Sequence, residues 1–207
     1  MATPIPTPIY HFTHAENLDQ VLQRGALICK NETERSRIQY RSAAFESVQA
    51  QRHEYAVPVS ARGSIHDYVP FYFNSKSPML YTIKCGNLPN IQMQHLVFFR
   101  STAQAVADAG KDFAFTDGHG IMSLSDYYDD LSELDQVPWQ VVNAQYWNDH
   151  VDGKRLRQAE FLVHQQLEWS LVDNVGVYSE EMKNWVSSRL LAGRQNPPVT
   201  VRRGWFF

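Results

Sequence analysis

The chain has 207 residues, of which 43% are hydrophobic and 20% are charged, and its net charge is −3. These values exclude wholesale disorder and exclude binding of nucleic acid through a basic field spread over the whole surface. Because no apolar run approaches the roughly 20 residues of a membrane helix, we expect no contact with a membrane. Two cysteines without a ligand motif are typical of the reducing cytoplasm. We expect an N-terminal tail of residues 1–9 and a single domain over residues 10–207.

The first ordered segment is predicted to be a strand, residues 10–13, that leads into a short helix. Residues 13–16 (THAE) have the form of a capping box, apolar residues follow at the spacing i, i+3, i+4 from Leu18, and Gly25 is expected to end the helix. His14 then lies in the first turn, where free N–H groups can hold an anion or ribose hydroxyls. A histidine packed against the core is the alternative. His11 and His14 have no third ligand at a suitable spacing, so no metal site is predicted.

Residues 30–62 carry six basic side chains and are predicted to form an exposed loop followed by a helix from about Ser42 to Arg52. Arg52 lies four residues after Val48, near the inward face of that helix. A buried arginine is unusual unless it is paired or binds an anion. Extension of the side chain into solvent is the open alternative.

Residues 64–81 contain three consecutive aromatic residues between two prolines, and they are predicted to form a strand, a polar turn and a second strand. A buried hairpin explains the pattern most simply. The polar residues His66, Asp67, Asn74 and Lys76 flank the aromatic surface, however, and this combination suits a flat ring such as a base or nicotinamide.

The second half of the chain alternates short strands and helices. We predict strands at 91–99, 113–115, 158–163, 175–178 and within 197–207, and helices after Ser101, over 125–136, and from Ser179 to Gly193. The loop at 116–120 (TDGHG) places His119 between two glycines, which allow close approach of a ligand to the backbone. In the strand at 158–163, Glu160 belongs either to a solvent-exposed face or to the floor of a cleft.

Four separated pieces carry a resemblance to a known family. They are YHFTHAENL from Tyr10, VQAQRHEYAVP from Val48, HDYVPFYFNSKSPMLY from His66, and the FTDGH loop from Phe115 followed by QAEFLV from Gln158. Together they resemble the DarT family, bacterial toxins that transfer ADP-ribose from NAD to thymine in single-stranded DNA. The resemblance covers residues 10–165. The family's usual arginine in the central loop is Lys76 here, which keeps the charge and loses the bidentate fork.

The resemblance implies an α+β fold of the ADP-ribosyltransferase type, a split pair of small twisted sheets with peripheral helices around a NAD cleft. It implies NAD as co-substrate without a metal, single-stranded DNA as the acceptor, and an antitoxin partner that carries a macrodomain. The implied site residues are Glu160 and Arg52 for catalysis; His14, Thr13, Asn17, Arg52, Tyr72 and Phe73 for NAD; and Lys76, Met79, His119, Lys154 and Arg155 for DNA. The alternatives are transfer to RNA or protein, and a non-catalytic nucleotide-binding or DNA-binding module.

Overall fold

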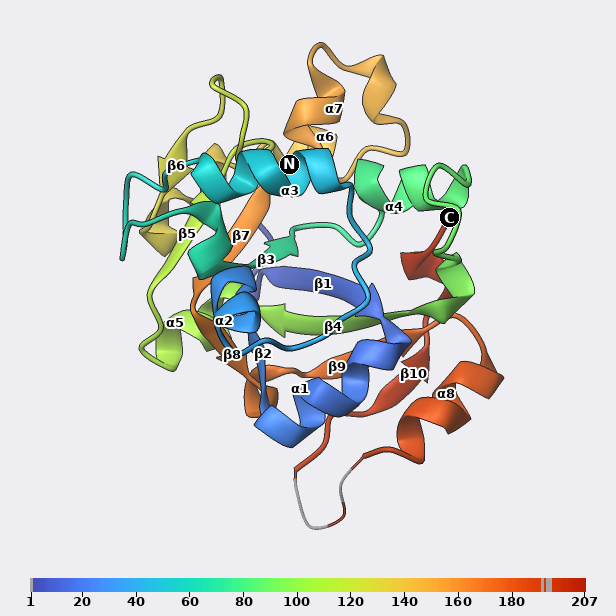
Figure 1. Cartoon of the computed structure of the whole chain (residues 1–207). Coiled ribbons are helices and arrows are strands. Elements are labelled where there is room, and N and C mark those ends of the chain that lie inside the picture. The colour runs from blue at the N-terminus through green and yellow to red at the C-terminus, as the bar shows by residue number, and fades with distance from the viewer. Residues whose placement is uncertain (1, 191, 193–194) are drawn as a thin grey trace.

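Most strands belong to one sheet that consists of two halves (Figure 1). The computed structural model describes residues 2–190, 192 and 195–207. The sheet has the order β10-β9-β4-β1-β3-β7-β5-β6, and β2 pairs with β8 in a separate small sheet. The strands are β1 (Pro8–His14), β2 (Ala26–Ile28), β3 (Tyr68–Tyr72), β4 (Leu96–Thr102), β5 (Phe113–Thr116), β6 (Tyr127–Tyr128), β7 (Glu160–His164), β8 (Gln166–Glu168), β9 (Asn174–Val177) and β10 (Val199–Val201).

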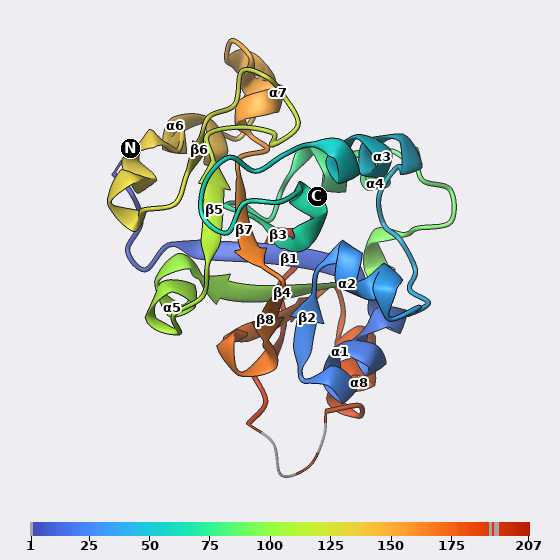
Figure 2. The same ribbon diagram turned by 60° about the vertical axis from the view of Figure 1, so that its left-hand side comes forward.

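The two halves meet between β1 and β3. Strands β1 and β4 pair along seven residues, and β3 and β7 pair along five, but β1 and β3 share the single pair Tyr10 and Tyr72. Figure 2 shows β1 and β4 crossing β5 and β7 at a steep angle. The predicted split pair of twisted sheets is therefore confirmed, and the two halves diverge on either side of one residue pair.

Helices surround both halves. They are α1 (Leu18–Arg24), α2 (Lys30–Arg35), α3 (Glu46–Glu54), α4 (Pro78–Lys84), α5 (Ala103–Asp108), α6 (Trp139–Val142), α7 (Gly153–Leu156) and α8 (Glu180–Ser187). In Figure 1, α3 and α4 lie along one side of the junction between the halves, while α1 and α8 lie at the opposite end of the molecule. The C-terminal residues lie beside α4 in both views.

Several predicted elements agree with the structure. Helix α1 ends at Gly25, whose φ of 71° is the left-handed conformation that favours glycine. Strands at 113–116, 160–164, 174–177 and 199–201 lie where strands are predicted, and Ser179 caps α8 through its hydroxyl. The predicted stop of that helix, Gly193, lies outside the described residues. Strand β1 begins at Pro8, two residues before the predicted start.

The prediction of a second strand after the central turn was wrong, because residues 78–84 form helix α4. Ser77 accepts a hydrogen bond from the Leu80 N–H (3.2 Å), and Pro78 occupies the first helical turn. A serine cap followed by proline is a helix-start signal, since the missing N–H of proline costs nothing there. Residues 125–136 likewise form the short strand β6 and a 3-10 turn (Leu131–Gln136) instead of one helix.

Candidate active site

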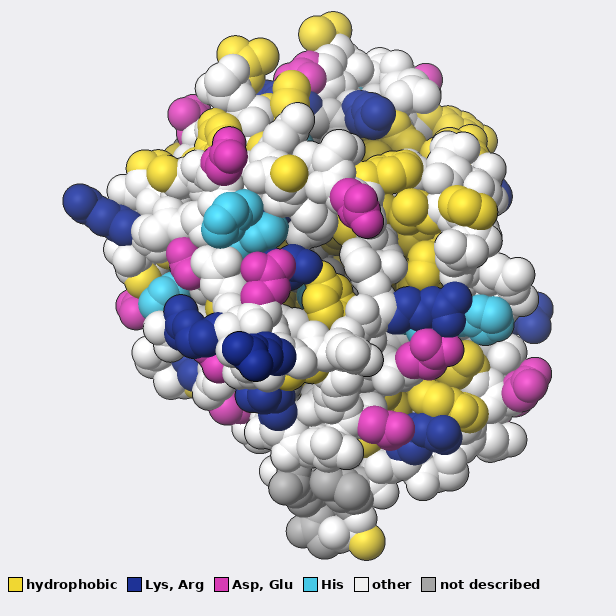
Figure 3. Space-filling model, in the orientation of Figure 1, with side chains coloured by type: hydrophobic (Ala, Val, Ile, Leu, Met, Phe, Trp, Pro, Cys, Tyr) yellow, Lys and Arg dark blue, Asp and Glu magenta, His cyan; other side chains and the backbone are white. Residues whose placement is uncertain are grey.

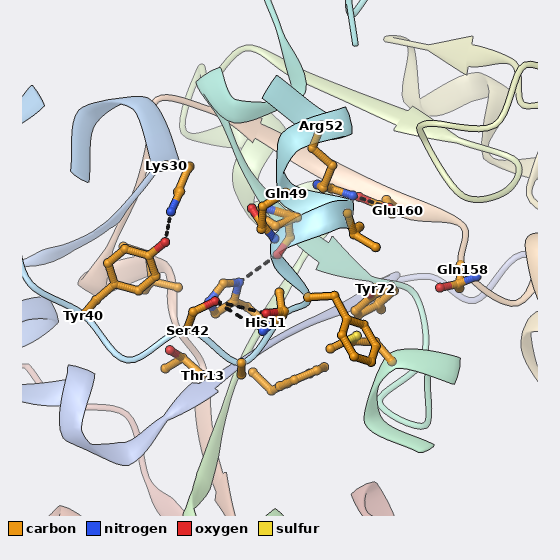
Figure 4. A pocket seen from close by; sticks show the side chains of 18 of the residues that line it. His11, Thr13, Lys30, Tyr40, Ser42, Gln49, Arg52, Tyr72, Gln158 and Glu160 are labelled. Atoms are coloured by element: carbon orange, nitrogen blue, oxygen red, sulfur yellow. Dashed lines mark hydrogen bonds and ion pairs between the residues drawn. The ribbon is translucent and has the colours of Figure 1, made fainter. Parts of the chain in front are cut away.

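A cavity of about 710 Å³ lies beside the junction of the two half-sheets. Its wall combines residues of β1, β3, β7, α1, α3 and α4 with the loop of residues 36–45 and the loop that carries His119. Figure 4 shows Arg52 and Glu160 pointing toward one another at this cavity, with Tyr72 close by. The volume lies within the range of small-molecule and cofactor sites, about 300–1,000 Å³.

Arg52 and Glu160 form a bidentate ion pair. Arg52 Nη1 donates to Glu160 Oε1 at 2.9 Å, and Nη2 donates to Oε2 at 2.7 Å. Glu160 is 1% exposed and Arg52 is 7% exposed. Of the two alternatives for each residue, the structure therefore selects the cleft floor for Glu160 and a buried, paired position for Arg52.

The pair keeps both groups charged. Burial opposes ionisation of Glu160, but the Arg52 guanidinium outweighs it and holds the pKa of the carboxyl below its ordinary value. Burial likewise opposes the charge of Arg52, and the carboxylate of Glu160 raises the pKa of the guanidinium. A fixed negative charge and a fixed positive charge thus stand side by side at a largely apolar cavity.

Backbone hydrogen bonds and strand register place Glu160. Its N–H donates to Thr116 Oγ1 (3.0 Å), and the Thr116 hydroxyl donates to the carbonyl of Gly118 (2.6 Å). Tyr72 is the direct register partner of Glu160 across β3 and β7, so both side chains lie on one face of the sheet. This face lines the cavity.

The loop that carries His119 is held by Arg155. The His119 N–H donates to the Arg155 carbonyl (3.0 Å), and Arg155 Nη1 donates to Ser125 Oγ (2.9 Å). A Cβ at position 118 would lie 2.5 Å from Arg155 Nη1, so a larger residue there would displace the Arg155 guanidinium. His119 Nδ1 accepts from the Ile121 N–H at 3.4 Å, so Nε2 carries the proton of the neutral ring. Burial lowers the pKa of His119, which favours that neutral form.

The residues predicted for NAD divide into two groups. Thr13, Asn17, Tyr72 and Arg52 line the cavity. Phe73 does not, because it packs in the core with ring contacts to Phe115, Trp139 and Phe161. We therefore leave Phe73 out of the site.

His14 is buried next to the cavity without lining it. Its Nδ1 accepts from the Glu16 N–H (3.3 Å) and caps the 3-10 turn, a role that the capping-box pattern assigned to Thr13. Its Nε2 is buried and has no hydrogen-bond partner. A buried donor or acceptor without a protein partner calls for one from outside the chain, such as a water molecule or a ligand.

Four of the five residues predicted for DNA line the cavity: Met79, His119, Lys154 and Arg155. Lys154 is exposed, whereas Arg155 forms ion pairs with Asp117 and Asp152. Lys76 lies outside the cavity, with Nζ 5.8 Å from the ring centroid of Phe207. The predicted contacts thus extend from the cavity toward α4 and the C-terminal residues.

Arg157, close in sequence to the basic residues Lys154 and Arg155, is 5% exposed and does not line the cavity. Its guanidinium donates to the carbonyls of Lys76 (3.0 Å) and Ala144 (3.1 Å) and to Asn74 Oδ1 (3.2 Å). No acid among the described residues pairs with it, and burial lowers its pKa to about 10. Arg157 therefore fixes the turn at 74–76 against the residues after α6.

The wall formed by residues 38–45 was not predicted from the sequence, which divided them between an exposed loop and a helix beginning at about Ser42. The prediction of that helix start was wrong, because α3 begins at Glu46. Ile38, Tyr40 and Phe45 all line the cavity. Lys30 contributes from α2, and Figure 4 shows it reaching the Tyr40 hydroxyl. Gln49 lines the cavity one helical turn before Arg52, and its Oε1 lies 3.1 Å from His66 Nε2.

Asn17 holds the loop of residues 36–45 in place. Its side chain accepts a hydrogen bond from the Arg41 N–H (2.8 Å) and donates one to the Arg41 carbonyl (3.0 Å).

Within residues 2–190, 192 and 195–207, no group of three or more His, Cys, Asp or Glu side chains could hold a metal ion. In the same described part of the chain, no helix is both long and apolar enough to cross a membrane.

The family model described as "ssDNA thymidine ADP-ribosyltransferase, DarT" matches residues 10–207. The chain belongs to the DarT family. The predicted family, its fold and its activity as an ADP-ribosyltransferase that modifies thymidine in single-stranded DNA are thereby confirmed.

DarT relatives match nearly the whole length of the chain. A DNA ADP-ribosyl transferase of Thermus sp. is 40% identical to this chain, and the match covers 99% of this chain and 98% of the length of that relative. The structure of Thermus sp. 2.9 DarT with ADP-ribosylated single-stranded DNA matches with a TM-score of 0.95 at 37% identity, covering 100% of this chain and 99% of that one. The same DarT with NAD+ gives a TM-score of 0.88 at 35% identity, with full coverage of both chains. A relative of Thermosipho africanus, named a DNA ADP-ribosyl transferase-DNA ADP-ribosyl glycohydrolase fusion protein, is 23% identical over 96% of this chain and 49% of its own.

The cavity residues fit NAD. The unpartnered Nε2 of His14 lies beside the cavity, Lys30 offers positive charge to phosphates, and Tyr40 and Tyr72 offer aromatic surface to flat rings. Thr13 and Asn17 supply polar groups at the same wall.

Proposed function

We propose that the buried pair Arg52–Glu160 is the catalytic centre at which this chain transfers ADP-ribose from NAD to a thymine base in single-stranded DNA. The observation that carries the proposal is the position of the pair, which is bidentate, almost fully buried, and open to a cavity large enough for a nucleotide. When bound, NAD supplies the ADP-ribosyl group and nicotinamide as the leaving group.

Glu160 acts through its fixed negative charge. Positive charge develops at the nicotinamide-side ribose as the bond to nicotinamide breaks, and a preorganised carboxylate stabilises that charge most in the transition state. Thr116 and the register with Tyr72 hold Glu160 in place, so little reorganisation is needed. The low pKa of Glu160 keeps the carboxylate ionised at neutral pH.

Arg52 acts as a cation rather than as a proton acceptor. Because its pKa is raised, the guanidinium has no capacity to accept a proton from the base. Its role is to orient Glu160 and to stabilise negative charge that develops on the ring nitrogen of thymine as that N–H is lost. Glu160, the carboxylate paired with Arg52, is the base that takes up this proton.

The acceptor base enters beside Met79 and His119. A base within a duplex is stacked and shielded, so a cavity of this kind favours a single strand whose base can turn out. The Nε2–H of His119 can donate to a carbonyl of the base, and Lys154, which is exposed at the rim, can contact phosphate. We assign Arg155 to holding the His119 loop, since Asp117 and Asp152 already neutralise its charge.

We further propose that the chain is a toxin neutralised by a macrodomain antitoxin that removes the modification. The support is the relative in which a DNA ADP-ribosyl transferase is fused to a DNA ADP-ribosyl glycohydrolase, an enzyme of the opposite activity. Co-expression of such a macrodomain should restore the growth of cells that express this chain, and growth that stays arrested would contradict the pairing.

The test of the catalytic proposal is transfer to separate pools of single-stranded DNA, duplex DNA, RNA and denatured protein in the presence of NAD. Mass spectrometry should show one added ADP-ribosyl unit on thymine-containing single strands only. Glu160→Gln should abolish the addition while the variant still binds NAD. Modification of RNA or protein alone would favour those acceptors, and NAD binding without transfer to any pool would favour a binding module.

A further inference from the structure

Three aromatic side chains that take no part in the cavity form a cluster at the surface. Tyr81 of α4 lies edge-on to Trp147 and to Phe207, with ring centroids 5.6 Å and 5.2 Å apart. Trp147 and Phe207 are themselves 6.0 Å apart. Tyr81 is 43% exposed, and none of the three belongs to the clusters of fully buried residues, although Phe207 packs partly against one. We call this set the aromatic platform.

Cations surround the platform. Lys76 Nζ lies 5.8 Å from the ring centroid of Phe207, and Lys84 Nζ lies 5.6 Å from the same ring and 5.8 Å from that of Tyr81. The guanidinium of the buried Arg157 lies 5.8 Å from the ring of Trp147. No acidic side chain is paired with Lys76 or Lys84 among the described residues. Both ammonium groups are therefore free to meet phosphates.

The platform is continuous with the proposed active site. Helix α4 presents Met79 and Thr82 to the cavity and Tyr81 to the platform. In Figure 3, hydrophobic side chains gather at the upper right, over α4 and the C-terminal residues, and next to the central hollow. A strand whose base enters the cavity beside Met79 would pass over this surface.

We propose that the aromatic platform binds the nucleotides that flank the reactive thymine, with bases stacked on Tyr81 and Trp147 and phosphates near Lys76 and Lys84. The inference rests on the proposed function. Alternating aromatic and basic groups along a track are the usual means of holding single strands, because every base has a face to stack and every linkage has a charge. In a chain of net charge −3, such a local concentration of cations against aromatic rings points to nucleic acid rather than to an ordinary solvated face.

The test is the affinity for oligonucleotides in the absence of NAD, measured by fluorescence anisotropy. The unmodified chain should bind an oligonucleotide of about 12 nucleotides at least tenfold more tightly than a trinucleotide centred on thymine. Tyr81→Ala and Trp147→Ala should each reduce the ratio of the two affinities, long oligonucleotide to trinucleotide, about fivefold to tenfold. Tyr81→Phe, which retains the stacking face, should keep the ratio of the unmodified chain. Trp185→Ala, on the remote α8, is the matched aromatic control and should leave the ratio unchanged.

Lys84→Gln isolates the contribution of one positive charge to the affinity for the oligonucleotide. The slope of log affinity against log salt should become shallower by about 0.7, the value for one phosphate contact on a single strand, and Lys183→Gln on α8 should not change it. An unchanged length ratio in both alanine variants would overturn the proposal, as would equal weakening by Tyr81→Phe and Tyr81→Ala. If a variant fails to fold, the unmodified chain is tested instead with oligonucleotides that carry abasic nucleotides on either side of the thymine. These should bind more weakly than the intact oligonucleotide, and an unchanged affinity would overturn the proposal that the platform stacks the flanking bases. Because no NAD is present, these results are independent of whether transfer occurs.

Discussion

Arg52 and Glu160 combine two roles, since the pair that we propose for catalysis is also buried in the fold. Removing one partner leaves an unpaired charge in an apolar site, which costs about 3–5 kcal/mol. Replacing both partners by apolar residues is often close to neutral. The presence of the pair in this chain is therefore better explained by chemistry than by stability.

We predict that Arg52→Met and Glu160→Leu each lower the free energy of unfolding by about 3 kcal/mol or more, and that the double variant recovers most of this loss while remaining inactive. Urea denaturation measures the three values. The exposed pair Lys183–Glu180 is the control, and its removal should change stability little. Additive losses in the double variant would show that the two charges do not compensate one another.

The Arg52–Glu160 pair also predicts how the free energy of unfolding depends on pH. Glu160 has a folded-state pKa below its ordinary value of 4.5, so its stabilising contribution is fully present above about pH 4.5 and is lost as the pH falls through the lower, folded-state pKa. The difference in unfolding free energy between the unmodified chain and Glu160→Gln should be constant from pH 8 to about 5 and should shrink below that. His14, whose pKa burial lowers, destabilises both proteins alike in acid and cancels in the difference. Burial also lowers the pKa of His119, but the Glu160 carboxylate raises it, so the comparison is made with His119→Asn in both proteins. A difference that shrinks between pH 8 and 6 would contradict the assignment.

At the scale of elements, local patterns predicted the strands and the capped helices better than the loops. Helix α1 and strand β7 follow from apolar spacing and alternation. The second strand predicted within residues 64–81 was wrong because the apolar run was weighed above the Ser77-Pro78 helix start. The wall formed by residues 38–45 could not be predicted, because it is held by Asn17, far away in sequence, and not by any local pattern. The motif residues of the site were found through the family resemblance. That Arg52 and Glu160 are buried and paired could be seen only in the fold, which brings together two residues far apart in sequence.

Asn17 therefore gives a prediction for this wall. Asn17→Ala removes both hydrogen bonds to the Arg41 backbone, so the loop at 36–45 should exchange its amide hydrogens faster and the KM for NAD should rise about fivefold to tenfold. Hydrogen exchange and steady-state kinetics measure the two effects. Asn184→Ala, exposed on α8, is the control. An increased KM without faster exchange would assign Asn17 to direct contact with NAD instead.

At the scale of the whole molecule, two half-sheets joined at Tyr10 and Tyr72 diverge around one cavity, and the polar chemistry concentrates at its floor. The surface as a whole is weakly acidic, so contact with DNA depends on a few local cations.

This distribution predicts a weak salt dependence of DNA binding. Lys76, Lys84 and Lys154 are the cations that we place along the strand, and three phosphate contacts correspond to a slope of about −2 in log affinity against log salt. Titrations at several salt concentrations measure the slope. A slope several times steeper would show that the strand follows a more extensive basic surface than the one we assign.

The central claim is that Arg52 and Glu160 direct ADP-ribose to the ring N–H of thymine, and the most direct measurement uses two single-stranded oligonucleotides. They are identical except that the single thymine of one carries a methyl group on its ring nitrogen. After incubation with NAD, mass spectrometry should show one ADP-ribosyl unit on the unmethylated strand, none on the methylated strand, and none on either strand with Glu160→Gln. Equal modification of both strands, or modification by the Glu160→Gln variant at the unmodified rate, would contradict the account.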